Sequence, residues 1–209
     1  MGADSDDELL NVYDAAGEIV GARPRTEAKQ SGLAVGAINV IVRDATGRVL
    51  LQRRPEGTEN GGRWDKSVGG HVGAGEEFDV TALRESGEEL FDDPSSKRVV
   101  LSRSKAHFDH TIASSDLAAA VVLRRMGLKL NLRDVRIADG GGKRVVRYHV
   151  AMYEGRTAIP VEGFRPQPSE IESLSYFTVA EVDQMLLDGA LAPNMAFLWL
   201  EYGHRLIGG

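Results

Sequence analysis

The 209-residue sequence contains no cysteine. This absence excludes disulfides, zinc–thiolate sites, iron–sulfur clusters and a cysteine nucleophile. No stretch of about 18 consecutive apolar residues occurs either, so the sequence predicts no membrane-spanning helix. The first residues, MGADSDDELL, are acidic and lack the positive and apolar segments of a signal peptide. We therefore expect a cytoplasmic protein without a membrane partner.

Positive charge is also scarce. The chain has 25 Lys and Arg against 31 Asp and Glu, a net charge of −6. This balance argues against an extended nucleic-acid partner, because such partners are bound by basic surfaces. It leaves a nucleotide substrate possible, because a bound divalent cation can supply the positive charge locally.

The order of apolar runs and turns predicts an α+β protein rich in strands. Residues 1–8 are expected to form a disordered acidic tail. Residues 9–30 are predicted to form a β-hairpin and a linker, and residues 31–209 the main domain. Two central strands are predicted at 34–43 and 49–53. Later elements are expected as a helix at 78–90, a helix at 117–126 stopped by Gly127, strands at 129–137, 145–154 and 171–177, a helix at 178–187 opened by a capping box, and a last helix from Ala192-Pro193.

The helix predicted at 78–90 carries the chemistry. Glu85, Glu88 and Glu89 stand at positions i, i+3 and i+4 and therefore share one face. Three carboxylates this close repel each other unless a cation lies between them, and all-oxygen ligands select Mg²⁺, Mn²⁺ or Ca²⁺ over zinc. Arg84 precedes Glu88 by four residues and can pair with it.

The opposite face of this helix is predicted to be an apolar stripe packed on a sheet, with the acids facing outward. The stripe consists of Val80, Leu83, Gly87 and Leu90. Glycine inside a helix is unfavourable by about 1 kcal/mol relative to alanine. Gly87 therefore predicts very close contact between helix and sheet.

A lone E-x-x-E-E pattern is usually a solvated helix face, but here it belongs to a longer pattern with fixed spacing. The pattern comprises Gly70, Glu76, Arg84, Glu85, Glu88 and Glu89. It resembles the box of the Nudix family, G-x5-E-x7-R-E-U-x-E-E-x-G-U, where U is apolar. The resemblance implies an α/β/α sandwich with a mixed central sheet, to which this chain adds an N-terminal β-hairpin and a C-terminal helix. It also implies Mg²⁺-dependent hydrolysis, with Mn²⁺ as a possible substitute, of a phosphoanhydride in a nucleoside diphosphate linked to another moiety.

The resemblance further implies a role for each box residue. The implied metal ligands are Glu85, Glu88, Glu89 and the backbone carbonyl of Gly70. Glu88 or Glu89 would act as base or orient the attacking water, and Arg84 would assist in catalysis. Glu76 would shape the loop before the helix, together with Arg84.

The end of the box departs from the family pattern, with Phe91 in place of glycine and Asp92 in place of an apolar residue. One interpretation is an insertion at about 92–126, with Gly127-Leu128 supplying the missing pair. The other is that the helix ends at Asp92 or Asp93, before Pro94. The sequence leaves both open.

The flanking segment LLQRRPEGTENGGRWDKSVGGHV resembles the Nudix branch related to isopentenyl-diphosphate isomerase. That isomerase relies on a catalytic cysteine near this G-H, and the present chain has none. Hydrolysis is therefore favoured over an isoprenoid diphosphate enzyme. A nucleotide-binding or regulatory module without turnover is the third hypothesis.

Outside the box, five residues are candidates for the site. Arg53 and Arg54 can bind phosphates through their guanidinium groups, or can be surface charges. Trp64 can stack on a base, although a core position is favoured. Glu170 and Glu172 are candidates for a general base contributed by a late loop. The partner is expected to be a small-molecule diphosphate, and the hairpin and last helix are candidate contacts of a homodimer.

Overall fold

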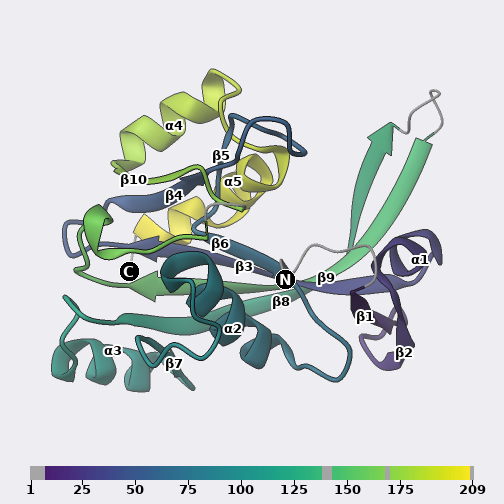
Figure 1. The fold of residues 1–209 in the computed structure, drawn as a ribbon, viewed down its shortest axis with the longest axis horizontal. Coiled ribbons are helices and arrows are strands. Elements are labelled where there is room, and N and C mark those ends of the chain that lie inside the picture. The colour runs from purple at the N-terminus through teal and green to yellow at the C-terminus, as the bar shows by residue number, and fades with distance from the viewer. Residues whose placement is uncertain (1–7, 138–142, 168–169, 208–209) are drawn as a thin grey trace.

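The computed structural model describes residues 8–137, 143–167 and 170–207 (Figure 1). The predicted acidic tail lies outside the described residues, apart from Glu8. The strands are β1 (Leu9–Tyr13), β2 (Ile19–Pro24), β3 (Ala34–Arg43), β4 (Val49–Arg53), β5 (Trp64–Asp65), β6 (Val68–His71), β7 (Val99–Ser102), β8 (Val121–Ile137), β9 (Lys143–Arg156) and β10 (Ser173–Phe177). The helices are α1 (Arg25–Gln30), α2 (Phe78–Phe91), α3 (Lys105–Ser114), α4 (Val179–Leu187) and α5 (Pro193–Ile207), with a 3-10 turn at Val161–Gly163.

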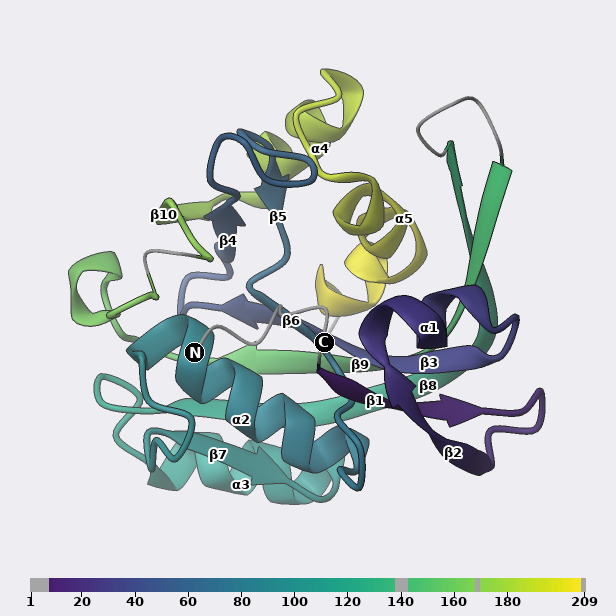
Figure 2. The same cartoon turned by 45° about the vertical axis from the view of Figure 1, so that its right-hand side comes forward.

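The strands form one mixed sheet in the order β10-β4-β3-β9-β8-β7. Strand β3 pairs in parallel with β9 and antiparallel with β4 and β6. Strands β1 and β2 form the predicted hairpin, which joins the sheet through β3 and lies beside α1 (Figure 2). The far part of the β8–β9 ribbon extends beyond the body of the sheet (Figure 1).

Two hydrophobic cores lie on opposite faces of this sheet. Side chains alternate along a strand, so Val40 and Val42 of β3 face α2, whereas Ile41 faces α4 and α5. On the first face Leu90 of α2 is fully buried, and on the second Met195 of α5 is fully buried. The result is a three-layer α/β/α sandwich, as the sequence predicted. Among the described residues, no helix has both the length and the apolar content that a membrane crossing requires.

Two predictions of local structure are wrong. The stretch predicted as a helix at 117–126 enters strand β8 at Val121, and the preceding helix is α3 at Lys105–Ser114. The fully buried Val121 and Val122 pair with β7 on one side, and Val122 also with β9 on the other, so tertiary pairing overrides the helical pattern. Asp116, which precedes this stretch, accepts a hydrogen bond from the N–H of Ala118 in a short turn. The predicted linker also contains helix α1.

Helix α2 ends at Asp92, before Pro94, in agreement with the second of the two interpretations. Asp92 adopts the left-handed conformation with φ 52°, and its N–H donates to the carbonyl of Glu88. The next N–H, that of Asp93, donates to the carbonyl of Gly87, so the orphan carbonyls of the helix end are capped. Gly127-Leu128 lies inside β8 and ends no helix. The insertion at 92–126 stays a prediction about domain organisation; the segment forms β7, α3 and the start of β8.

Gly87 has a different neighbour from the one predicted. A Cβ at this position would overlap the carbonyl oxygen of Asp93, in the loop that returns from the helix end. A glycine is needed here because the chain turns back closely against the helix after Asp92. The predicted close contact between helix and sheet does not explain it.

Candidate active site

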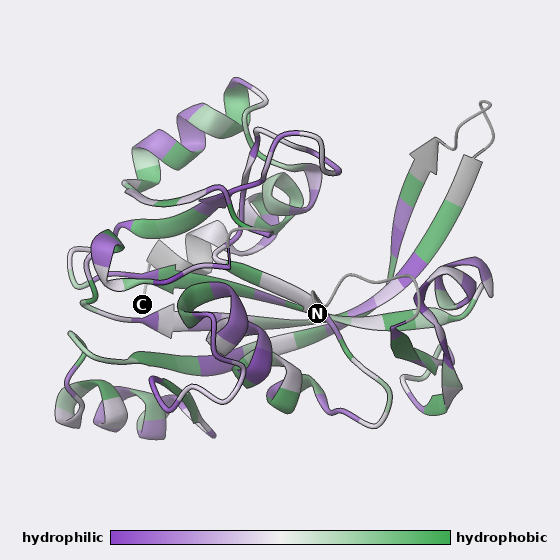
Figure 3. Ribbon diagram, in the orientation of Figure 1, coloured by the Kyte–Doolittle hydropathy of each residue, from purple (hydrophilic) through white to green (hydrophobic). Residues whose placement is uncertain are grey.

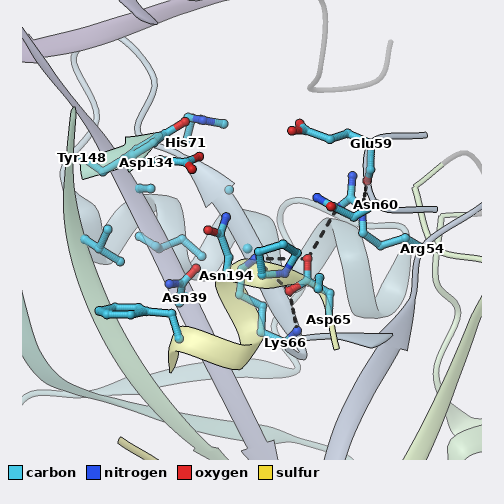
Figure 4. A pocket seen from close by; sticks show the side chains of 18 of the residues that line it. Asn39, Arg54, Glu59, Asn60, Asp65, Lys66, His71, Asp134, Tyr148 and Asn194 are labelled. Carbon is cyan, nitrogen blue, oxygen red and sulfur yellow. Dashed lines mark hydrogen bonds and ion pairs between the residues drawn. The ribbon is translucent and has the colours of Figure 1, made fainter. Parts of the chain in front are cut away.

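A cavity of about 620 Å³ lies beside the buried face of α2, with strands β3 and β6 and the loop of residues 54–66 in its walls (Figure 4). Carboxylates and cations both line it. The acids nearest α2 are Glu85, Glu89 and Glu170, and the cations of the loop wall are Arg54 and Lys66. Charged side chains of both signs therefore form part of the cavity wall.

Glu85 and Glu89 point into the molecule, so the prediction of outward-facing acids is wrong for these two. Glu85 is 3% exposed and Glu89 is 5% exposed. The bare backbone of Gly70 makes room for Glu85, because a Cβ at this position would overlap the Glu85 carboxyl group. The N–H of Gly69 and the side-chain amide of Gln52 both donate to Glu89.

The predicted apolar stripe of α2 is consequently wrong in part. Leu90 is buried, but Val80 is 51% exposed. Figure 3 shows that α2 is hydrophilic over much of its length although it packs against the sheet. Gly69 and Gly70 of β6 explain this. Because they have no side chains, polar side chains of α2 can lie against the sheet where apolar contacts would otherwise be required.

Arg84 connects the other box residues. Its Nε lies 2.9 Å from Glu76 Oε1 and its Nη1 lies 2.8 Å from Glu88 Oε2. Its Nη2 also lies 3.0 Å from Glu85 Oε1. Burial works to raise the pKa of Glu76, but hydrogen bonds from Arg84 and Thr81 outweigh burial and lower it. The guanidinium thus fixes the loop before α2 to the helix itself, the geometry that the predicted loop-shaping role of Glu76 requires.

The two buried glutamates have strongly perturbed acidities. Burial, supported by repulsion from Glu88 and Glu170, raises the pKa of Glu85 to about 8 despite the attraction of Arg84. Burial and repulsion from Glu85 and Glu170 also raise the pKa of Glu89 well above its usual value, and Lys66 opposes this rise. In the free protein the Glu85 carboxyl group therefore tends to keep a proton near neutral pH.

A hard divalent cation fits this donor set. Within the described ranges, no three His, Asp or Glu side chains already form a ligand cage, and Glu88 is held by Arg84. The buried carboxylates of Glu85 and Glu89 and the Gly70 backbone against which Glu85 packs are oxygen donors, as Mg²⁺ prefers. A cation there would offset the burial and the repulsion that together raise both pKa values.

The structure separates the substrate-binding candidates. Arg54 lines the cavity, whereas Arg53 pairs with Glu172 at 3.5 Å and Glu56 at 3.8 Å. Trp64 packs edge-on against Phe177, with ring centroids 4.7 Å apart, and belongs to the core under α4 and α5. This partly buried position against the core favours the core interpretation of Trp64.

The general-base candidates also separate. Glu170 lines the cavity beside Glu85 and Glu89, and its charge contributes to the raised pKa of both. Glu172 instead forms its ion pair with Arg53. Of the two glutamates of this loop, Glu170 is the one that lines the cavity.

Sequence reasoning missed Asp65 and Lys66 in the cavity wall. Both are buried, and their charged groups lie 3.3 Å apart. The available signal was the charged pair itself, which follows Trp64 and immediately precedes the apolar and glycine run of β6.

Comparison with known proteins identifies a family. The family model described as "NUDIX domain" matches residues 33–198. The chain is 41% identical over 87 residues to "Uncharacterized Nudix hydrolase SCO1686" of Streptomyces coelicolor, an alignment covering 41% of this chain and 48% of that protein. It is 34% identical over 85 residues to "Isopentenyl-diphosphate Delta-isomerase" of Serratia proteamaculans, covering 40% and 48%. The chain thus spans about half the length of these two relatives.

A longer match and two solved structures extend the comparison. "Uncharacterized Nudix hydrolase PA4841" of Pseudomonas aeruginosa is 29% identical over 156 residues, covering 74% of this chain and 88% of that protein. DR0079 from Deinococcus radiodurans has a TM-score of 0.58 at 20% identity, covering 91% and 96%. The NUDIX domain of Shewanella oneidensis NrtR, complexed with ADP ribose, has a TM-score of 0.50 at 15% identity, covering 83% and 88%. At these identities the two structures support the fold alone.

Proposed function

Because the chain belongs to the Nudix family, we propose that it hydrolyses a phosphoanhydride in a nucleoside diphosphate linked to another moiety, with Mg²⁺ as cofactor and Mn²⁺ as a possible substitute. The observation that carries this proposal is the pair of buried glutamates, Glu85 and Glu89, over the glycine backbone of β6. A structural role does not account for two buried carboxylates that repel each other. A cation that binds phosphate as well as carboxylate does.

The cofactor, when bound, would supply positive charge to the phosphate oxygens and make the attacking water more acidic. Glu85, Glu89 and the Gly70 carbonyl would hold it, with Glu88 joining if Arg84 releases that carboxylate. Arg84 would keep α2 and its preceding loop in register through Glu76.

The remaining chemistry falls to cavity residues outside the helix. Glu170, beside Glu85 and Glu89, would accept the proton of the attacking water as general base. Arg54 would bind the phosphates with its guanidinium fork. Water then attacks one phosphorus, the bridging oxygen leaves with the other phosphate, and the P–O–P bond is cleaved.

Two alternatives compete with hydrolysis. A binding or regulatory module is conceivable because the NUDIX domain of NrtR binds ADP ribose. An isoprenoid diphosphate enzyme is conceivable because isopentenyl-diphosphate isomerases are among the relatives. The absent cysteine disfavours the second, and the two buried glutamates disfavour the first, because binding alone does not need them.

A turnover assay separates the three. The chain is incubated with Mg²⁺ and, separately, ADP-ribose, a dinucleotide, a sugar nucleotide, a nucleoside triphosphate and isopentenyl diphosphate, and products are followed by ³¹P NMR. New phosphate monoesters with wild type, absent with Glu89→Gln, would support hydrolysis. Binding without turnover by both proteins would reject it, and isomerisation of isopentenyl diphosphate would establish the isomerase alternative.

A further inference from the structure

A second charged group lies in the wall of the cavity, centred on Asp65. The Asp65 carboxylate lies 3.3 Å and 3.4 Å from Lys66 Nζ through its two oxygens, and 3.6 Å from Arg54 Nη1 (Figure 4). One carboxylate thus serves two cations. Asp65, Lys66 and Arg54, which we call the Asp65 cluster, carry an excess of positive charge where they line the cavity.

Lys66 is deeply placed for a lysine. Its side chain is 10% exposed, and that of Asp65 is 5% exposed. Removing an ammonium group from water costs several kcal/mol even when it is paired, and a well-packed apolar residue in its place is often neutral or stabilising. Stability therefore does not explain why a lysine stands here, and the cavity that it lines suggests a ligand.

Gly69 is what allows Lys66 to lie in this position. The lysine side chain packs directly against this residue of β6, and a Cβ at Gly69 would overlap Lys66 Cε and lie 2.8 Å from Nζ. The N–H of Gly69 meanwhile donates to the Glu89 carboxylate at 3.4 Å. One backbone position therefore brings the ammonium group and the candidate metal-binding carboxylate into the same part of the cavity.

The chemistry of the Asp65 cluster indicates its ligand. An ammonium point charge beside a guanidinium fork matches an anion with several oxygens, such as a phosphate. The Nε of Arg54 also donates to the carbonyl of Glu59 at 2.7 Å, so the fork is held from two sides. The two cations are thus oriented before any ligand arrives, which lowers the entropy lost on binding.

We propose that Lys66 binds a non-bridging phosphate oxygen of the substrate, in a phosphate site where Asp65 holds it beside Arg54 and Gly69 makes room for its side chain. The proposal rests on the proposed function, since it assigns a residue to the same cavity. It adds a second phosphate-binding cation that the sequence did not indicate. Its test is a binding measurement, so that it can succeed or fail separately from hydrolysis.

The probe is methylenediphosphonate, which presents two adjacent phosphonate groups and has no P–O–P bond to hydrolyse. Its Kd is measured by isothermal titration calorimetry with Mg²⁺ in excess, for wild type and Lys66→Met. Because one hydrogen bond to a charged group contributes about 1.5–3 kcal/mol, we expect Kd to rise about 10- to 100-fold. The matched control is Lys105→Met, which removes an exposed lysine of α3 that pairs with Asp109 outside the cavity, and it should bind as wild type does.

A second comparison tests the packing of Lys66 over Gly69. Gly69→Ala should displace the lysine and weaken methylenediphosphonate binding about as much as Lys66→Met does. The double variant should then bind no more weakly than either single variant, because both changes remove the same contact. Lys66→Arg, which keeps the charge, should recover part of the affinity, and this separates a binding role from a purely structural one.

The outcomes are distinct. Unchanged Kd for Lys66→Met, or no measurable binding of methylenediphosphonate by folded wild type, would overturn the proposal. If Lys66→Met does not fold, the binding of methylenediphosphonate by Lys66→Arg and Gly69→Ala tests the proposal in its place. Wild-type affinity in Gly69→Ala would then overturn the proposal. Weakened binding in a protein that hydrolyses no diphosphate would sustain the phosphate site and refute the proposed function.

Discussion

Helix α2 carries two groups of charges that differ in how well they are neutralised. In the first, Arg84 lies among Glu76, Glu85 and Glu88, with N–O distances of 2.8–3.0 Å. In the second, Glu85 meets Glu89 and Glu170, and burial and mutual repulsion raise the pKa values of Glu85 and Glu89. We call the first the Arg84 group, because that guanidinium holds the helix in place, and the second the Glu89 group, because its carboxyl groups repel one another.

The contrast shows how one motif divides its residues between structure and chemistry. An ion pair that neutralises its members lowers the free energy of the folded state only modestly, but breaking it leaves a buried charge. A group of like charges is unfavourable until a ligand neutralises it, which makes it a good place to bind a cation. The predictions below separate the two groups.

The largest effect is expected for Glu89→Gln, which alters the Glu89 group. Loss of a carboxylate needed by the cation should lower kcat by roughly 10³-fold or more, in line with the loss of a principal catalytic group. The free energy of unfolding without metal should not fall, because a repelling charge has gone. Steady-state kinetics and urea denaturation measure the two quantities. A destabilised but active variant would contradict the assignment.

In the Arg84 group, a substitution should lower the stability of the folded protein. Arg84→Met leaves the carboxylates of Glu76 and Glu88 without their shared cation, and we expect the free energy of unfolding to fall by about 2–4 kcal/mol. Urea denaturation with and without Mg²⁺ checks this. Stability equal to wild type in both conditions would show that the Arg84 group does not hold the helix.

The comparison extends to the late loop. Glu170→Gln should lower kcat by about 10²-fold, the size of an ordinary general-base contribution, with little change in the affinity for Mg²⁺. Glu172→Gln is the matched control, because its carboxylate pairs with Arg53. Equal activity of the two variants would remove Glu170 from the mechanism.

Spacing predicts the helix and the loop before it, whereas the roles of their residues follow only from the family resemblance. The positions of Gly70, Glu76 and Arg84 relative to the three glutamates indicate the helix and its loop before any coordinates are known. The direction of the glutamates could not be predicted, because the helical pattern assigns polar residues to solvent. The pairing of β6 with β3 places the bare backbone of Gly70 against Glu85 and the N–H of Gly69 against Glu89, and so makes their burial possible.

The fold shows the same limit. Local signals gave the hairpin, the capping box at Thr178 with Glu181, and both central strands. The start of β8 was missed because Val121 and Val122 become a strand through partners distant in sequence. Helix α3 did have a local signal, since Ser104 accepts a hydrogen bond from the N–H of His107 as an N-cap.

The smallest effect concerns the end of α2, away from both groups. Asp92→Gly places the residue that favours left-handed backbone where φ is 52°, and should stabilise the protein by about 0.5–1 kcal/mol. The gain should appear in urea denaturation with kcat unchanged. A loss of stability would mean that the Asp92 side chain stabilises the helix end by more than its left-handed backbone conformation costs.

The most direct test of the account is the thermal unfolding midpoint, Tm, of wild type and Glu85→Gln from pH 5 to 9, with and without Mg²⁺. The raised pKa of Glu85, about 8, means that the folded state keeps a proton that the unfolded state has lost above about pH 4.5. Stability without metal should therefore fall as pH rises from about 4.5 to 8, and then level off.

We predict that Mg²⁺ raises the Tm of wild type, most strongly near pH 8 and above, where the repelling carboxylates are ionised. In Glu85→Gln the fall with pH should be smaller and the effect of Mg²⁺ should be greatly reduced. Identical pH profiles in the two proteins, with no effect of Mg²⁺ on either, would contradict the claim that the buried glutamates of α2 form a cation site.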